Sequence, residues 1–230
     1  MVKKVEILGM SLNSFMVQES MLQLEEYWNK TIMSTIENIS METLVKAHGD
    51  EELKNCIENL DLSVICDKEI LKAAGVASRQ WVQEITENKF FKEFMRRTVN
   101  GERHVYLLGE TQQQVELMQD FLEKAYLNIE ITGGYALSEC TGDYDAVINE
   151  INIEAPDVIL SVLPTPVQEY FLKEHKEKLN AKVWYGLGQY APDKKGVSEM
   201  ADFARKLLQK GIMHSILLRY HKNKGDDSDE

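Results

Sequence analysis

Short apolar runs alternate with longer segments of mixed apolar and polar residues along most of the chain. The clearest run, from Val158 to Leu163, stops at Pro164-Thr165-Pro166. A run of this length, rich in Val, Ile and Leu, is typical of a strand that is buried on both faces. Each proline fixes φ and disfavours helix in the residue before it, so a sharp loop should follow. The pattern predicts a strand over 157–163 and a helix over 167–179.

The same alternation recurs on both sides of this stretch. After residue 100 it predicts further strands over 104–108, 128–132 and 182–187, and helices over 112–126, 144–154, 197–210 and 213–220. Before residue 100 it predicts strands over 5–9, 31–36 and 62–66, and helices over 20–28, 41–48, 50–59 and 68–74. Asn13 and Ser14 are the expected caps of the first helix, and Glu37-Asn38 should end the second strand.

Strands that alternate with helices of about 10 to 15 residues indicate a parallel sheet with helices on both faces. The predicted fold class is therefore α/β, as a three-layer α/β/α arrangement. No linker rich in Pro, Gly or Ser divides the chain, which favours one domain over 1–221, with a seam near residue 100 as the alternative. The acidic tail over 222–230 should be disordered.

The composition is that of a soluble globular protein with a strong acidic balance. Of the 230 residues, 43% are hydrophobic and 28% are charged, and the net charge is −12. A nucleic-acid-binding face is basic, so the charge argues against nucleic acid as a partner. It also disfavours electrostatic binding to an anionic membrane surface.

The cysteines, the histidines and the N-terminus bear on location and metals. The three cysteines make no C-x-x-C pair, and the five histidines show no spacing suited to a metal, so we expect no metal site. The N-terminal apolar run is too short for a signal peptide, and no run of about 18 apolar residues exists. We expect reduced thiols, no transmembrane segment and a cytoplasmic protein.

Candidate binding residues follow several predicted strands. They are Gly109-Glu110-Thr111, Gly134-Tyr135 and Gly186-Leu187-Gly188-Gln189. The ends of parallel strands meet at one sheet edge, where ligands bind, and backbone N–H groups at a helix start attract phosphate. Neither a G-x-G-x-x-G nor a P-loop motif is present, and the alternative for these glycines is turn formation.

Four further side chains bear on the chemistry. Asp67 ends a predicted strand, where it could act as a general base or cap the helix over 68–74. Gln168 and Glu169 follow the proline loop, and their alternative role is the first turn of a helix, where the dipole favours Glu. Cys66 follows an apolar run and suits a small buried residue better than a nucleophile.

The order of these motifs resembles the WecG/TagA/CpsF glycosyltransferases (family 26). The resemblance covers about residues 4 to 190. It rests on Val5-Glu-Ile-Leu-Gly9, Asp50-Glu-Glu-Leu-Lys, Leu60-Asp-Leu-Ser-Val64, Val105-Tyr-Leu-Leu-Gly109, Gly134-Tyr135, Ile148-Asn-Glu-Ile-Asn152, Pro156-Asp-Val-Ile-Leu160, Pro166-Val-Gln-Glu169 and Gly186-Leu-Gly188.

The resemblance implies a Rossmann-like fold and transfer of a sugar, typically N-acetylmannosamine or its uronic acid, from a UDP donor. The usual acceptor is a polyprenyl-diphosphate-linked sugar on the cytosolic side of a bacterial membrane, in cell-surface polysaccharide synthesis. The family mechanism is inverting and metal-independent, with an aspartate proposed as the base. No cofactor is implied beyond the UDP-sugar itself, and the protein could lie at the inner face of the membrane.

The sequence also departs from the family pattern. The family's strand-end Asp-Gly motif falls on Cys66-Asp67, or on Asp67-Lys68 with one inserted residue, so either Cys66 or Asp67 takes the catalytic position. The family's Thr-Pro-Asn motif has no clean counterpart: counting back from Asp50 gives Asn38-Ile39-Ser40, and a two-residue shift gives Glu37 beside Asn38. The proline loop keeps Gln168 and Glu169 but has Val167 in place of a lysine that could meet a diphosphate. The family's basic C-terminal appendage is expected to be absent, as in a truncated, divergent member.

Two main hypotheses follow. In the first, the protein transfers a sugar, Asp67 is the base, and a donor pocket is lined by Asn38, Gly109, Glu110, Thr111, Gly134, Tyr135, Gln168, Glu169, Gly186, Gly188 and Gln189. In the second, it has lost catalysis and acts as a nucleotide-sugar-binding or partner-binding subunit. A domain for another nucleotide is a third, weaker class. The partners to consider are a nucleotide-sugar, a lipid-linked glycan acceptor, a partner protein and a second copy of the chain.

Overall fold

A parallel sheet of six strands runs through residues 4–188, the part of the chain that the computed structural model describes. The strands lie in the order β4-β3-β8-β7-β5-β6, and each neighbouring pair is parallel. Their bounds are β3 (Ser34–Ile39), β4 (Leu62–Ile65), β5 (His104–Gly109), β6 (Glu130–Ala136), β7 (Val158–Ser161) and β8 (Val183–Gly186). The predicted α/β class is confirmed.

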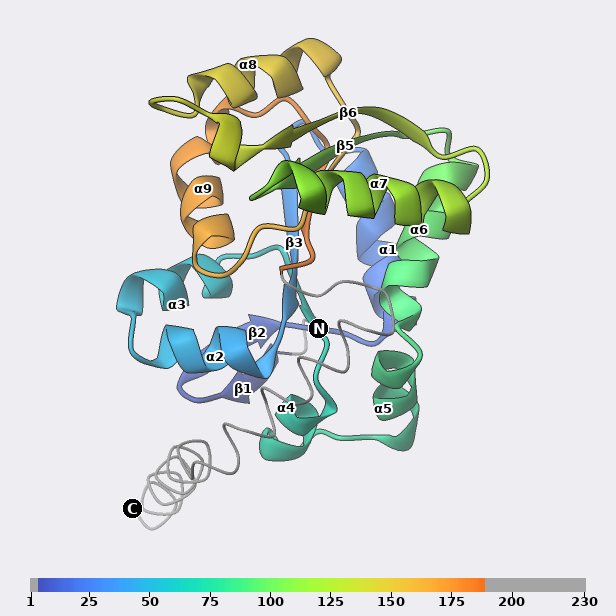
Figure 1. The fold of residues 1–230 in the computed structure, drawn as a ribbon. Coiled ribbons are helices and arrows are strands. Elements are labelled where there is room, and N and C mark those ends of the chain that lie inside the picture. Colours follow the sequence, from blue (N-terminus) through green and yellow to red (C-terminus); the bar gives the residue numbers. More distant parts are fainter. Residues whose placement is uncertain (1–3, 189–230) are drawn as a thin grey trace.

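Helices cover both faces of this sheet. One face carries α2 (Met41–His48), α3 (Glu51–Glu58), α8 (Asp145–Glu154) and α9 (Val167–His175). The other carries α1 (Val17–Trp28), α6 (Lys89–Asn100) and α7 (Gln112–Ala125). In Figure 1, α3 and α9 lie to the left of β3, and α1 and α6 lie to its right. The predicted three-layer arrangement is therefore confirmed.

The apolar runs in the sequence reflect this double covering. Along β5, Val105 and Leu107 pack towards α1, α6 and α7, whereas Tyr106 and Leu108 pack towards the opposite helices. Successive side chains of a strand point to opposite faces, so a strand between two helix layers needs apolar residues at every position. This is why the runs do not alternate with polar residues.

The N-terminal segment forms a hairpin that the sequence did not predict. The strands β1 (Lys4–Ile7) and β2 (Met10–Asn13) are antiparallel. Leu8 and Gly9 form the turn with φ of 51° and 72°, and positive φ at both central residues suits the twist of a tight hairpin. Asn13 therefore belongs to a strand, and the prediction that it caps a helix was wrong. The first turn of α1 is held by Glu84, whose Oε2 accepts a hydrogen bond from the Val17 N–H at 2.9 Å.

Two strands extend beyond their predicted ends. The strand predicted over 31–36 is β3, and it includes Glu37 and Asn38, which pair with β4 and continue the ladder. The strand predicted over 128–132 is β6, and it includes Gly133, Gly134 and Tyr135. A polar or glycine residue was taken to end each strand, but the neighbouring strands supply hydrogen-bond partners at those positions as well.

The remaining elements connect the layers. They are α4 (Lys68–Ala73), α5 (Arg79–Thr86) and the 3-10 helices η1 (Leu137–Glu139) and η2 (Lys176–Lys178). The stretch 78–97, for which no element was predicted, contains α5 and most of α6. The helices predicted over 197–210 and 213–220, the tail predicted to be disordered and Gln189 lie outside the described residues.

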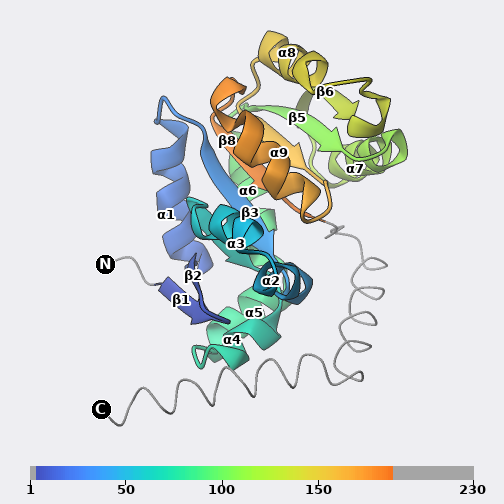
Figure 2. The ribbon, with the colours of Figure 1, turned by 90° about the vertical axis from the view of Figure 1, so that its left-hand side faces the viewer.

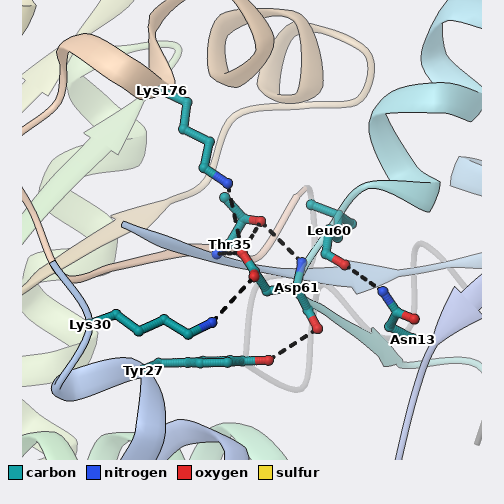
Figure 3. A network of polar contacts seen from close by, with 7 residues as sticks. All are labelled: Asn13, Tyr27, Lys30, Thr35, Leu60, Asp61 and Lys176. Carbon is teal, nitrogen blue, oxygen red and sulfur yellow. Dashed lines mark hydrogen bonds and ion pairs between the residues drawn. The ribbon is translucent and has the colours of Figure 1, made fainter. Parts of the chain in front are cut away.

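A polar network fastens the strands at the amino edge of the sheet, as Figure 3 shows. The Asp61 carboxylate accepts hydrogen bonds from the N–H and the hydroxyl of Thr35 at 2.8 and 3.0 Å. Lys30 and Lys176 each lie 3.7 Å from this carboxylate, and the Tyr27 hydroxyl donates to the Asp61 carbonyl at 3.0 Å. The network joins α1, β3, β4 and the end of α9.

The sheet changes its winding direction between β5 and β7. The connection from β5 through α7 leads to β6 on one side, and the connection from β7 through α9 leads to β8 on the other. Because α7 and α9 lie on opposite faces, the carboxyl ends of β5 and β7 form a topological switch point, and open α/β sheets hold ligands in the crevice outside the strand ends at such a point. The candidate site is therefore at this edge.

The contact between α7 and β6 yields a test of the packing. A Cβ atom at Gly134 would lie 2.7 Å from Cγ1 of Val115. We expect Gly134→Ala to lower the free energy of unfolding by about 1–3 kcal/mol, measured by urea denaturation, because the added methyl overpacks the contact. The control is Gly49→Ala, where no atom lies within 4 Å of the added Cβ.

The double variant Gly134→Ala/Val115→Ala separates this clash from other causes. Removing the valine methyl should relieve the overpacking, so the two changes together should cost less than the sum of their separate costs. Strict additivity would show that the valine contact is not what excludes a side chain at Gly134.

Candidate functional site

Backbone hydrogen bonds hold the loops at the carboxyl edge against one another. The Val162 N–H donates to the Leu108 carbonyl at 2.8 Å, and the Leu187 N–H donates to the Ser161 carbonyl at 2.7 Å. The ends of β5, β7 and β8 therefore lie side by side. This places the glycine-containing loops and the proline loop, three stretches that the sequence singled out, at one edge of the sheet.

The first turn of α9 points into the protein. Gln168 and Glu169 are both buried, and the Thr165 hydroxyl donates to Glu169 Oε1 at 2.8 Å. Gln168 lies over Gly186, where a Cβ atom would come within 2.5 Å of its amide. Gly186 is thus required by the position of Gln168, and the two polar side chains are not simply the solvated start of a helix.

A second buried carboxylate faces Glu169. Glu37, in the middle of β3, is 1% exposed, and burial together with the charge of Glu169 raises its pKa well above the usual range. The Gln168 amide and the Trp184 indole oppose that rise. Among the described residues, neither oxygen of Glu37 has a hydrogen-bond partner, nor has Oε2 of Glu169. Burial also raises the pKa of Glu169.

Sequence reasoning missed Glu37 as part of the site because it was expected to end a strand. The signal that could have identified it is a lone acidic residue between apolar neighbours, Ile36 and Ile39, in a segment with strand character. A carboxylate in such a strand is costly unless it meets a cation, a donor or a proton. Its position beside Glu169 depends on the packing of α9 and could not be read from the sequence.

Lys46 brings a cation to the proline loop. This side chain, from α2, donates to the Thr165 carbonyl at 2.7 Å and pairs with Glu42 at 2.9 Å. Its charge lowers the pKa of Glu169, against the larger effect of burial. The proline loop has Val167 in place of a lysine of its own. Lys46, which is distant in the sequence and was not predicted, therefore supplies a cation beside the loop.

Asp67 lies at the end of β4 with one carboxylate oxygen fixed. Oδ2 accepts from the Met41 N–H, at the start of α2, at 2.7 Å. The side chain makes no capping bond to α4, so the alternative that it caps its own helix was wrong. It is half-buried, and desolvation raises the pKa of its carboxyl group. A raised pKa brings a carboxylate closer to what a general base needs near neutral pH.

Cys66 is poorly suited to nucleophilic chemistry. Its thiol donates to the Ile39 carbonyl at 3.2 Å, and burial raises the pKa of the thiol well above its usual value. Since the thiolate is the reactive form, this environment keeps the sulfur unreactive. Of the two neighbours at the end of β4, Asp67 therefore has the more suitable chemistry.

Asn38 lies on the face opposite Glu37. Its Oδ1 accepts from the Tyr185 hydroxyl at 3.0 Å, and it is 7% exposed. The Tyr185 ring packs against Phe94, with ring centroids 4.7 Å apart. Asn38 is thus fixed within the sheet, on the side of α6, and is separated from Gln168 and Glu169 by the strand itself.

A side chain of α7 already accepts hydrogen bonds from the backbone N–H groups of the loop after β5. Thr111 and Gln114 form a capping box at the start of α7, and Gln114 Oε1 accepts from the N–H groups of Glu110 and Thr111 at 2.9 and 3.2 Å. Those two N–H groups therefore already have partners. Gly109 is needed for packing, because an added Cβ would lie 3.0 Å from Val115 Cγ2.

The other predicted residues lie nearby in different settings. Gly134 and the half-buried Tyr135 belong to the edge strand β6, opposite Leu107 and Leu108. Gly188 has a positive φ of 63°, which a glycine adopts at no steric cost. Among residues 4–188 no group of three or more His, Cys, Asp or Glu side chains could hold a metal ion, and no helix is long and apolar enough to cross a membrane.

Comparison with known proteins adds to this geometry. The family model for the Glycosyl transferase WecG/TagA/CpsF family matches residues 5–192. That range contains the whole sheet and every loop described above. No curated protein matches the chain.

The pair of buried carboxylates predicts a distinctive pH dependence. The folded-state pKa values of Glu37 and Glu169 are raised, so the folded protein holds more protons than the unfolded chain between the ordinary and the raised pKa. Their contribution to stability is therefore full below the ordinary glutamate pKa and is lost as pH rises through the raised values. We expect the free energy of unfolding, measured with urea up to pH 7.5, to fall as the pH rises above the ordinary glutamate pKa.

Glu37→Gln should remove most of this fall and make the protein more stable at pH 7.5, by roughly 1–3 kcal/mol, because a neutral amide replaces an unpartnered buried carboxylate. The matched control, Glu26→Gln, changes an exposed glutamate of α1 and should leave the pH dependence unchanged. A Glu37→Gln variant that keeps the wild-type slope would show that the pair does not titrate in this range.

Proposed function

The chain belongs to the WecG/TagA/CpsF family of glycosyltransferases, and we propose that it transfers a hexosamine-type sugar, of the N-acetylmannosamine class, from a UDP-sugar to a lipid-linked or other glycan acceptor. The match over residues 5–192 carries this proposal. The fold supports it through the topological switch point between β5 and β7, where the winding of the sheet reverses. The implied pathway is cell-surface polysaccharide synthesis at the cytoplasmic face of a membrane.

The proposed donor site is the carboxyl edge of the sheet. The loops that border it converge, as the contacts of Val162 and Leu187 with neighbouring strands illustrate. The residues proposed to line it are Asn38, Gly109, Glu110, Thr111, Gly134, Tyr135, Gln168, Glu169, Gly186, Gly188 and Gln189. We add Lys46, because a cation beside the proline loop suits a diphosphate.

Asp67 is the proposed base. In an inverting transfer, the base takes the proton of the acceptor hydroxyl while that oxygen attacks the anomeric carbon opposite the leaving UDP. The bond to UDP breaks as the new glycosidic bond forms, so the configuration inverts and UDP departs with the bonding electrons. The raised pKa of Asp67 and its place at a strand end support this role, whereas the buried Cys66 thiol does not.

A binding subunit without catalysis is the second candidate. Val167 leaves the proline loop without its own cation, and the two N–H groups at the start of α7 already have Gln114 as a partner. Both features weaken the contacts that a diphosphate needs. In this alternative the protein would bind a nucleotide-sugar, or a partner protein, without turnover.

Calorimetric titration with UDP and UDP-sugars tests the proposal. We expect UDP to bind, and we expect Asp67→Asn to lower donor turnover by about 10² or more while leaving the UDP affinity unchanged, because general-base catalysis contributes on this scale. Asp120→Asn, at an exposed position of α7, is the control. Absence of nucleotide binding would exclude the transferase, and binding with no turnover would favour the binding subunit.

Lys46 supplies a separate prediction for the diphosphate. Lys46→Met keeps the length of the side chain but removes its charge, and it should weaken UDP binding about tenfold in the same titration, because it removes a charge-assisted contact. Lys72→Met, an exposed lysine of α4, should not change the affinity. Equal affinities of Lys46→Met and the wild type would remove Lys46 from the donor site.

A further inference from the structure

A cleft of about 630 Å³ lies between α3 and α9, away from the strand-end loops. Figure 2 shows the two helices side by side over the sheet. The volume suits a small organic molecule. Glu169 is the one described residue of the proposed donor site that lines it, so the cleft is a different cavity that meets the donor site at a single side chain.

The deepest side chains of this cleft are acceptors without partners. Glu37 and Glu169 both line it, and they are 1% and 2% exposed. Among the described residues, both oxygens of Glu37 and Oε2 of Glu169 accept no hydrogen bond, and the same holds for Oε1 of the adjacent Gln168. The Gln168 amide and the Trp184 indole lie close enough to lower the pKa of Glu37, but neither completes a hydrogen bond to its oxygens. Buried acceptors in proteins are normally paired, so this group indicates a missing donor.

The charges on the walls point to a cation. The lining carries six glutamates and three lysines. Each lysine already has a partner: Lys173 pairs with Glu52 of the same lining, and Lys176 and Lys178 pair with Asp61 and Asp145, which do not line the cleft. Within residues 4–188, no lysine or arginine forms an ion pair with Glu37 or Glu169. The cleft is thus acidic overall, and among the described residues its most deeply buried carboxylates form no ion pair, although the charge of Lys46 reaches Glu169.

We propose that this cleft binds a small organic cation with a primary ammonium head, which lies against Glu37 and Glu169. An ammonium group has three N–H donors and no acceptor, which matches a floor made of acceptors. The apolar part of the ligand would lie along Leu60 and Leu172, which line the same cleft. The positive charge of the ligand favours the ionised form of Glu37 and Glu169, against burial, which raises their pKa values.

Titration calorimetry of the full chain with 1,4-diaminobutane tests this proposal. We expect saturable binding of 1,4-diaminobutane. Butane-1,4-diol has the same length without charge, and tetramethylammonium has the charge without N–H donors, so neither should compete. Competition by either compound, or no binding of the diamine, would overturn the proposal.

Two variants locate the binding. Glu37→Gln should weaken diamine binding at least about tenfold, because it removes a charge-assisted contact. Asn55→Trp, on the exposed wall formed by α3, should narrow the cleft and weaken binding without touching the carboxylates. Asn55→Trp also tests the location of the binding site if Glu37→Gln does not fold. Glu26→Gln is the matched control, and unchanged affinity in both cleft variants would overturn the assignment.

Two ligands distinguish the cleft from the donor site, which share Glu169. UDP titrated into the same sample reports on the proposed transferase function, whereas the diamine reports on the cleft. Loss of UDP binding with intact diamine binding would reject the proposed function alone, and the reverse pattern would reject the cleft ligand alone.

Discussion

The insertion of β8 between β3 and β7 is the contact on which the rest of the structure depends. Val183 pairs with Ser34 on one side and with Val158 on the other, so a strand near the end of the described chain joins the first strands of the sheet to the later ones. Without it, β3 and β4 would form a separate two-stranded sheet, which is marginal alone. The winding reversal also exists because β8 fills this place.

The position of β8 also sets the chemistry of α9. Gly186 leaves room for Gln168, and the same turn of α9 carries Glu169 over the sheet to face Glu37. Two carboxylates are thereby buried together between the donor edge and the cleft under α3. Burying them is unfavourable, and natural proteins tolerate such groups where a proton, a cation or a ligand satisfies them. The geometry thus links the proposed donor edge with a cavity of different character.

The sequence predicted the α/β class, the helices on both faces and the family, because each depends on local periodicity and on motif order. The prediction failed where contacts with residues distant in the sequence determine the local structure. Glu37 and Gly134 looked like strand ends, but neighbouring strands continue the ladder there. Asp67 was expected to cap its own helix and instead holds Met41. The contact of Lys46 with the proline loop joins residues 119 positions apart and has no local signal.

Hydrogen–deuterium exchange of the full chain with and without UDP tests most directly whether the carboxyl edge is the donor site. The account predicts slower exchange in the peptides that contain residues 109–114, 162–170 and 186–188, where the loops after β5, β7 and β8 meet. It predicts unchanged exchange along the α3 wall of the cleft, over residues 51–60. Protection confined to the α3 wall, or none at saturating UDP, would contradict it.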